Sequence, residues 1–284
     1  MNLALLFLLG AIWGTSFLFI KIVVTEIGPL TLVAGRLGLA ALLMWAVLKA
    51  RGVPIPRDRK IWGTYAGIGL LNGALPFSLI SWGEQFIPSG WAALLQSTTP
   101  IFTILLAHLL THDDRLTWSK ALGVTLGFGG VGLLMLPEIR QGLNASVWGM
   151  LAIVGSSISY AFASIYARRR LVGQHPMASA AGQFTMGFAY MVPLAFLLER
   201  PLQIAPTAGA IGSWVTLAVL GTVVAYVIYY TLLGRTSATF TTMVTYIVPI
   251  NGLLLGTLVL GEPMSSVILL SLGMVLAGVL MVRR

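Results

Sequence analysis

Polar side chains surround a proline in two apolar stretches of the chain. Gln96, Thr99 and Pro100 occur in the first stretch, and Thr245 and Pro249 occur in the second. A proline inside a helix has no N–H, so the carbonyl four residues earlier, here that of Gln96 or Thr245, loses its partner. These carbonyls could hold an ammonium group; in the alternative interpretation, nearby hydroxyls bond back to their own helix. Because the pattern occurs twice, we favour polar groups that face a wet cavity.

Aromatic and hydroxyl side chains form a second group that could bind a solute. Trp13 lies half-way along an apolar run with Phe17 one turn later, and Tyr226 and Tyr230 are one turn apart. Such rings could contact a flat or apolar side chain while hydroxyls and amides hold polar groups; ordinary packing is the alternative. The predicted substrate-binding residues are Trp13, Ser16, Phe17, Ser78, Trp82, Gln96, Thr99, Ser157, Tyr160, Ser164, Tyr226, Tyr230, Thr245, Tyr246 and Asn251, with helix breaks at Pro100 and Pro249.

Charged residues inside the apolar runs are few. Arg36 could attract a carboxylate, but we favour a structural role in which it extends toward the membrane interface or pairs with Glu26 or Glu84. Lys21 is expected to be a similar anchor. Proton relays usually use an acidic residue or a histidine inside the membrane, and we expect none near the middle of a run. Facilitated movement is therefore favoured over proton coupling, with coupling through Glu84 or through backbone carbonyls as the alternative.

Metal or cofactor chemistry finds little support in the sequence. His108 and His112 are one helical turn apart, next to Asp113 and Asp114, but no third ordered ligand has a matching spacing. The chain has no cysteine and no glycine-rich phosphate loop that ends in Lys-Ser or Lys-Thr. An enzyme embedded in the membrane would require a His or Asp near a serine nucleophile. The serines in the apolar runs have no such residue at the same depth. We therefore expect no metal, no cofactor and no enzyme activity.

The elements that position these residues are predicted to be membrane-spanning helices. Of the 284 residues, 57% are hydrophobic and 9% are charged, whereas a soluble domain has about 25% charged residues. Runs such as residues 37–48 are apolar on every face, unlike the strands of a β-barrel. Since a spanning helix needs about 20 apolar residues, we predict an all-α integral membrane protein with ten transmembrane helices. They cover residues 3–25, 29–49, 61–83, 88–110, 116–136, 146–168, 178–198, 209–231, 237–260 and 263–282.

The connectors between these runs separate the basic residues onto two sides. Side one holds Lys49, Arg51, Arg57, Arg59, Lys60, Arg115, Lys120, Arg168, Arg169, Arg170, Arg235, Arg283 and Arg284, and side two holds Arg140 and Arg200. By the positive-inside rule, side one and both termini are cytoplasmic. These scattered groups account for the net charge of +9, so we expect no nucleic-acid partner. The first run is too long for a cleaved signal peptide, so Met1 is expected to remain.

The chain resembles itself at an offset of 149 residues. Residues 96–110 align with residues 245–259 without a gap, and Pro100 falls on Pro249. The match divides the chain into two five-helix repeats, residues 1–137 and 146–284, joined by an external connector at 138–145. Since five is odd, the second repeat is inverted, which is typical of transporters with a site between the repeats. The runs that begin at 3, 61, 88, 146, 209 and 237 are expected to line the path. The glycine-rich runs 116–136 and 263–282 are expected to brace it or, in the alternative, to form an oligomer contact.

Four features together resemble the EamA-type drug/metabolite transporter superfamily. They are the GAIWGTSF run at residues 10–17, Pro29 followed by Arg36, Pro100 with Pro249, and Gly261-Glu262-Pro263. The resemblance covers essentially the whole chain, and within the superfamily the chain is most similar to the YddG-like bacterial exporters of amino acids, particularly aromatic ones. One departure is that the first half reads His-Asp-Asp-Arg at residues 112–115 where the second half reads Gly-Glu-Pro. This departure weakens the repeat at that loop.

These features predict a membrane transporter that exports small organic solutes, above all amino acids including aromatic ones, by alternating access and facilitated movement. The resemblance implies the bacterial inner membrane, which the chain crosses several times. The expected partners are a small-molecule substrate and the lipid bilayer, and the protein is expected to be a monomer or a homodimer. One alternative is an exporter of lipophilic cationic drugs or other metabolites with the same architecture, with or without proton coupling. A membrane-embedded enzyme is less favoured.

Overall fold

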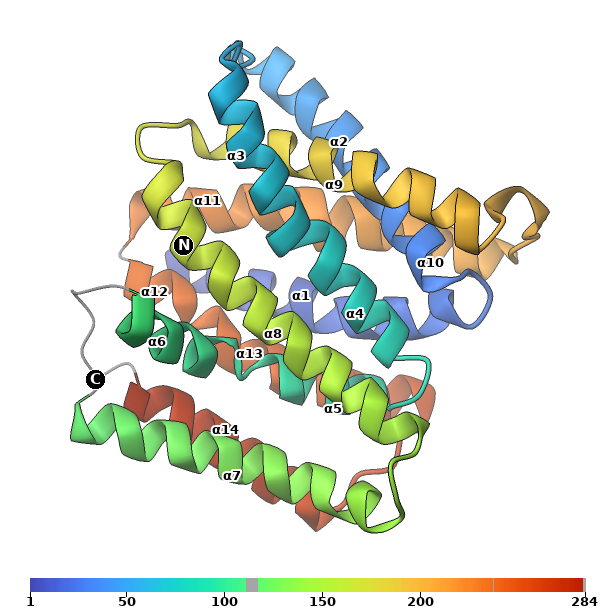
Figure 1. Cartoon of the computed structure of the whole chain (residues 1–284), viewed down its shortest axis with the longest axis vertical. Coiled ribbons are helices and arrows are strands. Elements are labelled where there is room, and N and C mark those ends of the chain that lie inside the picture. The colour runs from blue at the N-terminus through green and yellow to red at the C-terminus, as the bar shows by residue number, and fades with distance from the viewer. Residues whose placement is uncertain (111–116, 237, 283–284) are drawn as a thin grey trace.

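The computed structural model describes residues 1–110, 117–236 and 238–282, and it contains no strand within these ranges. The elements are α1 (Asn2–Val24), α2 (Pro29–Ala50), α3 (Arg59–Gly69), η1 (Leu70–Ala74), α4 (Leu75–Gly83), α5 (Ser89–Gln96), α6 (Thr99–Leu110), α7 (Trp118–Arg140), α8 (Ala145–Arg170), α9 (Pro176–Leu198), η2 (Pro201–Gln203), α10 (Ala208–Ala218), η3 (Val219–Val224), α11 (Ala225–Arg235), α12 (Ala238–Thr242), α13 (Val244–Leu260) and α14 (Ser266–Val282). The predicted all-α class is confirmed (Figure 1).

Each predicted run coincides with one helix or with consecutive helical pieces. Among the described residues, eight helices are long and apolar enough to cross a membrane, and Ser266–Val282 is a shorter apolar helix. The remaining run is formed by α3, η1 and α4 in succession. These helices are apolar on all sides because one face contacts other helices and the other contacts lipid. The fold is therefore that of an integral membrane protein.

Several helices are interrupted at mid-length, where a site could form. The π-helical turns η1 and η3 begin 149 residues apart, which is the offset found within the sequence. The run with Pro100 is broken at Ser97 and Thr98, so Pro100 falls in the first turn of α6, where its missing N–H costs nothing. Pro249, in contrast, lies inside α13. Interruptions of this kind often occur at functional sites because they redirect side chains and carbonyls.

Helices α7 and α14 form a closely packed pair at one edge of the bundle, where they run side by side (Figure 1). The contact is so close that a Cβ atom added to Gly123 would lie 2.7 Å from the backbone oxygen of Gly278. A Cβ atom added to Gly278 would lie 2.7 Å from the backbone nitrogen of Gly127. Small residues at the contact allow two helices to approach this closely. Outside this pair, the two helices contact only α5, α6 and α8 to any extent among the described residues.

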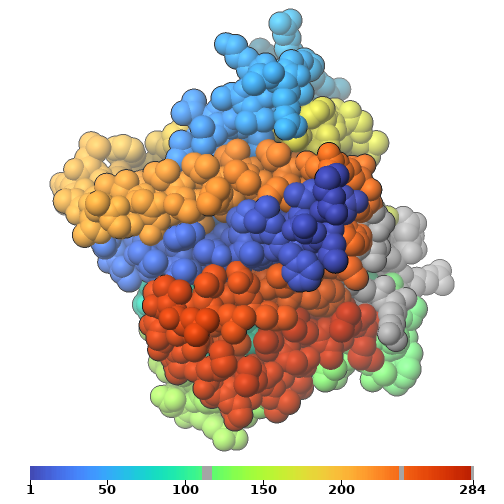
Figure 2. Space-filling model, turned by 180° about the vertical axis from the view of Figure 1, so that it is seen from behind, coloured from blue at the N-terminus to red at the C-terminus, as the bar shows by residue number. Residues whose placement is uncertain are grey.

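The other helices pack across the boundary between the two predicted repeats. Helix α1 packs against α13, α2 against α9, and α4 against α8. Seen from behind, α1 lies between the band formed by α10 and α11 and the C-terminal helices (Figure 2). The interior of the bundle is therefore built from both repeats together.

Helix α1 begins and α14 ends on the same side of the molecule, at the left in Figure 1. This is side one of the sequence analysis, and side two is the opposite end. That side one is cytoplasmic stays a prediction. Six residues of the earlier interpretations lie outside the described residues: His112, Asp113, Asp114, Arg115, Arg283 and Arg284.

Candidate functional site

A cavity of about 1230 Å³ occupies the middle of the bundle. Small-molecule sites usually enclose about 300–1,000 Å³, so a small organic solute fits with space to spare. Phe77 and Ile80 of α4 line its inner end, and the exposed side chains of Arg168 and Arg169 line its mouth at side one. As expected, the runs that begin at residues 3, 61, 88, 146, 209 and 237 contribute lining residues, but so do α2 and α9. Within the described residues, α7 and α14 contribute none.

Aromatic rings from several helices form one wall of the cavity. The ring centroid of Trp13 in α1 lies 5.7 Å from that of Tyr229 and 6.2 Å from that of Tyr226, both in α11. The Tyr226 ring also packs edge-on against Phe184 of α9 at 5.0 Å and against Tyr230 at 5.9 Å. Edge-to-face pairs of this kind hold one another in place. The wall offers a fixed apolar surface with hydroxyl groups at its edge.

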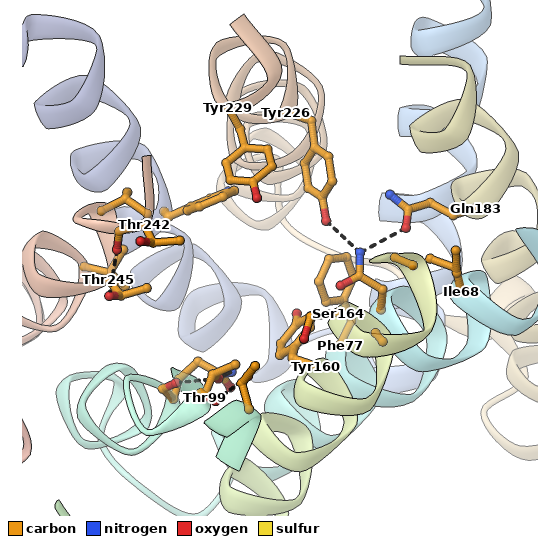
Figure 3. A pocket seen from close by; sticks show the side chains of 18 of the residues that line it. Ile68, Phe77, Thr99, Tyr160, Ser164, Gln183, Tyr226, Tyr229, Thr242 and Thr245 are labelled. Carbon is orange, nitrogen blue, oxygen red and sulfur yellow. Dashed lines mark hydrogen bonds between the residues drawn. The ribbon is translucent and has the colours of Figure 1, made fainter. Parts of the chain in front are cut away.

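An amide network lies next to this wall, as the dashed lines of Figure 3 mark. Asn72 Nδ2 donates to Gln183 Oε1 at 2.9 Å and to the Tyr226 hydroxyl at 3.2 Å. The three residues come from η1, α9 and α11, and all line the cavity. Sequence reasoning missed Asn72 and Gln183, although an amide in the middle of an apolar run was a usable signal.

Arg36 lines the cavity from α2 and is only 5% exposed. Its Nε donates to Thr222 Oγ1 at 2.9 Å, and its guanidinium carbon lies 4.0 Å from the centroid of the Phe77 ring. The favoured interpretation as an interface anchor is wrong, because the side chain is buried in the bundle. The expected pairing with Glu26 or Glu84 is also wrong, because among the described residues Arg36 forms no ion pair.

The broken run around Gln96 has fewer unsatisfied groups than the sequence predicts. The Gln96 backbone carbonyl accepts hydrogen bonds from Thr99 Oγ1 at 2.8 Å and from Ser157 Oγ at 3.4 Å. The Gln96 side chain donates to Thr99 Oγ1 at 3.0 Å and accepts from Ser156 Oγ at 2.6 Å. The expectation that this carbonyl could hold an ammonium group is therefore wrong, because two hydroxyls already occupy it. The side chains of Gln96 and Thr99 nevertheless line the cavity.

Ten of the fifteen predicted binding residues line this cavity: Trp13, Ser16, Phe17, Gln96, Thr99, Tyr160, Ser164, Tyr226, Tyr230 and Thr245. Figure 3 shows Thr99, Tyr160 and Ser164 on one side of it and Tyr226 and Tyr229 on the other. Five predicted residues do not line it: Ser78, Trp82, Ser157, Tyr246 and Asn251. Helix rotation explains these differences, since a hydroxyl or amide in an apolar run can serve a packing seam as well as a cavity.

The five residues outside the lining have other surroundings. Asn251 Nδ2 donates to the Ala11 carbonyl at 2.8 Å and joins α13 to α1. Ser157 is fully buried next to the Gln96 carbonyl, and Ser78 Oγ donates to the Ala74 carbonyl at 2.7 Å. Trp82 is 39% exposed and packs against Phe86. Tyr246 lies in α13, packed against the main apolar core.

The cavity is closed at side two, because none of the connectors at that end, all of them described, contributes a lining residue. Two carboxylates there bind the first N–H groups of helices from the other predicted repeat. Glu199 accepts from the backbone N–H groups of Leu30 and Thr31 in α2 at 2.9 and 2.7 Å. Glu262 accepts from those of Ser89 and Gly90 in α5 at 2.6 and 3.0 Å. The first N–H groups of a helix have no partner within the helix and carry partial positive charge, so a carboxylate suits them.

A third carboxylate makes the reciprocal contact. Glu26, which follows α1, accepts from the backbone N–H of Thr207 at 2.7 Å and from its hydroxyl at 2.8 Å, and Thr207 caps α10. Lys21 Nζ also lies at this end and donates to the Glu84 and Ile87 carbonyls at 2.5 and 2.9 Å. We call Glu26, Glu199 and Glu262 the side-two carboxylates. They hold the two predicted repeats together at the closed end.

Glu84, which follows α4 at side two, has an unusual environment. The sequence places it at a helix end, yet its side chain is fully buried. Within the described residues, neither of its carboxyl oxygens has a hydrogen-bond partner. It does not line the cavity. The buried acid therefore adjoins the closed end, next to Lys21 and outside the lining of the cavity.

Comparison with known proteins gives consistent results. The EamA-like transporter family matches residues 1–136 and residues 147–284. The chain is 31% identical over 281 residues to the uncharacterized inner membrane transporter YedA of Escherichia coli (strain K12). This alignment covers 98% of this chain and 89% of YedA. It is 26% identical over 272 residues to a probable terminal-alkyne amino-acid exporter of Streptantibioticus cattleyicolor, with 96% and 90% of the two chains covered.

A solved structure described only as the crystal structure of a protein has the same fold. The TM-score is 0.69 at 18% sequence identity, and the alignment covers 99% of this chain and 96% of that chain. At this level of identity the likeness concerns the fold alone.

Proposed function

Because the chain belongs to the EamA-like transporter family, it is a membrane transporter, and we propose that it exports amino acids, aromatic ones among them, across the bacterial inner membrane. The printed function of the Streptantibioticus cattleyicolor relative, a probable amino-acid exporter, supports this class of solute. In this function the solute leaves the protein chemically unchanged, and we propose no enzyme activity. Its partners are the solute and the bilayer, and it works as a monomer or a homodimer with both termini in the cytoplasm.

The observation that carries the proposal is the cavity, which is open at side one and closed at side two. Trp13, Tyr226 and Tyr229 offer an apolar face to a side chain, and Asn72 and Gln183 offer amide groups next to it. A site of this composition suits a small solute with one apolar part and one polar part. An amino acid that enters from a cytoplasmic side one would reach this site directly.

Alternating access between two inverted repeats is the mechanism that we propose. Two observations support a repeat: the family matches both halves of the chain, and the π-helical turns η1 and η3 begin 149 residues apart. To release the solute at side two, one repeat would rock against the other and the side-two carboxylates would leave their helix ends. The mouth at side one would close in the same movement.

We propose that the concentration gradient of the solute itself drives transport. Among the described residues that line the cavity, none is Asp, Glu or His, the side chains that usually carry protons across membranes. Coupling through the buried Glu84 is the alternative. A proton gradient would then change the rate of transport.

A second candidate cargo is a lipophilic cation, because aromatic faces attract cations. The rings of Trp13, Tyr226 and Tyr229 favour this candidate. Arg36, Arg168 and Arg169 disfavour it, since these cations line the same cavity. An amino acid, which carries a carboxylate, fits the charge of the cavity better.

The test is transport by the purified protein in liposomes, with Trp13→Ala as the variant. We expect labelled phenylalanine to move at the same rate with and without a proton gradient. Trp13→Ala should lower the initial rate roughly tenfold, because it removes two ring contacts worth about 0.5–1.5 kcal/mol each as well as apolar surface. Size-exclusion elution and thermal unfolding check that the variant folds.

Trp148→Ala is the matched control, since Trp148 is exposed on α8 and does not line the cavity. It should transport at the rate of the unchanged protein. Movement of lipophilic cations but not of amino acids would overturn the proposed cargo. A rate that rises several-fold with a proton gradient would overturn facilitated movement.

A further inference from the structure

We propose that Arg36 is the anchor for a carboxylate group of the transported solute, and that it restricts the cargo to carboxylates with an apolar or aromatic part. This inference rests on the proposed transport function and adds to it the chemical class that the site selects. Its basis is a guanidinium that is buried in the bundle and lines the inner end of the cavity, where none of the described lining residues is acidic.

A buried cation normally needs a partner of opposite charge. Removal of a charged group from water is costly unless it is paired and hydrogen-bonded. The direct contacts of Arg36 among the described residues are one neutral hydroxyl, that of Thr222, and one aromatic face, that of Phe77. Both are weaker partners than a carboxylate. The buried carboxylate of Glu84 acts on Arg36 only at a distance, because no hydrogen bond joins the two side chains. The cavity therefore has a positive inner end that a bound anion would neutralise.

The guanidinium is held in a fixed position by residues of both predicted repeats. Thr222 lies in the π-helical turn η3, where its hydroxyl donates to the Leu217 carbonyl at 3.2 Å and accepts from Arg36 Nε at 2.9 Å. Phe77 of α4 stacks on the cation, and Tyr160 of α8 packs edge-on against Phe77 at 6.5 Å. A guanidinium fixed through Nε presents its two terminal nitrogens together. This is the geometry that binds a carboxylate through two parallel hydrogen bonds.

The surroundings of Arg36 define the rest of the ligand. Tyr160 and Tyr226 line the cavity together with Arg36, and Tyr226 belongs to the aromatic wall that contains Trp13. A solute with its carboxylate on Arg36 could place an apolar side chain against this wall. The α-ammonium group has no comparable fixed anion among the described lining residues, so the carboxylate is the group that the site selects.

The experiment measures competition against labelled phenylalanine in liposomes that contain the full-length protein. The competitors are unlabelled phenylalanine, 3-phenylpropionate, which keeps the carboxylate and lacks the ammonium, and phenylalaninamide, which lacks the carboxylate. We expect 3-phenylpropionate to compete within about threefold of phenylalanine, and phenylalaninamide to compete roughly 10- to 100-fold less well, as loss of a charge-assisted pair of hydrogen bonds implies.

Three variants test whether Arg36 causes this discrimination. Arg36→Gln should remove it, so that the amide competes as well as the amino acid. Arg36→Lys keeps the charge but not the paired geometry and should retain part of it. Thr222→Val keeps Arg36 but removes the hydroxyl that accepts from its Nε, and it should weaken the discrimination between phenylalanine and its amide several-fold. This variant tests the inference even if Arg36→Gln does not fold. Arg170→Gln is the matched control, because Arg170 is exposed at the end of α8 and does not line the cavity.

The outcomes separate this inference from the proposed function. If the unchanged protein moves phenylalanine but the amide competes as well as the amino acid, the inference is wrong and the function stands. The same conclusion follows if a folded Arg36→Gln variant keeps full discrimination. If the unchanged protein moves no amino acid, the proposed function fails. The carboxylate anchor would be supported if 3-phenylpropionate competes less well in the Arg36 and Thr222 variants and equally well in the Arg170→Gln control.

Discussion

The two ends of the cavity are built from different contacts. At side two, Glu26, Glu199 and Glu262 bind the first N–H groups or the cap of helices in the other predicted repeat. At side one, the exposed side chains of Arg168 and Arg169 line an open mouth. The closed end is thus a set of charge-assisted hydrogen bonds, and the open end is a gap between helices.

This difference indicates how the closed end could open at moderate cost. A carboxylate and a helix N-terminus that separate can both be hydrated, so each pair contributes only about 1.5–3 kcal/mol. Opening an apolar plug would expose apolar surface to water at a free-energy cost of about 25 cal/mol per Å². Unlike polar groups, the exposed surface would gain no hydrogen bonds to water in return. Polar contacts at side two therefore suit a gate that must open and close repeatedly.

The largest expected effect is a difference in labelling rate between the two ends. The chain has no native cysteine, so a single introduced cysteine reports without background. Ser164→Cys, in the cavity, should react with a maleimide roughly 10- to 1000-fold faster than Ser89→Cys, which is fully buried beneath Glu262. This range corresponds to a side-two-open state populated at about 0.1–10%. Equal rates would contradict the asymmetry of the two ends.

The next largest effect is expected when two side-two carboxylates are removed together. Glu199→Gln combined with Glu262→Gln should speed the labelling of Ser89→Cys at least roughly tenfold, because a neutral amide binds helix N–H groups less well than a carboxylate. Glu138→Gln is the control: Glu138 accepts from Asn144 in the connector and does not join the repeats. No change in the double variant would show that these contacts do not keep side two closed.

The smallest effect is expected for Glu26→Gln alone. Its hydrogen bonds to Thr207 are exposed, and exposed charged contacts contribute about 0–1 kcal/mol. Labelling of Ser89→Cys should therefore rise by no more than about fivefold, and added salt should produce a similar change in the unchanged protein. An effect larger than that of the double variant would reverse the proposed order of importance.

Much of the fold could be predicted from the sequence, because a membrane helix is specified by the length and composition of its run. The glycines of α7 and α14 indicated that these helices can approach a neighbour closely, and Trp13, Tyr226 and Gln96, which the sequence predicts to bind substrate, line the cavity. The carboxylate contacts at side two could not be predicted. A glutamate at the end of a run is an ordinary interface residue until folding brings a particular helix N-terminus beside it.

What the sequence by itself determined is where the chain enters the membrane, because apolar length and charge decide that locally. What only the tertiary structure decided is which face of each helix meets the cavity. That choice separates Ser164 from Ser157 and Thr245 from Asn251, and it moves Arg36 from the interface to the inner end of the site. The physical reason is that the rotation of a helix about its axis depends on how it packs against helices distant in sequence. The apolar composition of a single run does not specify that rotation.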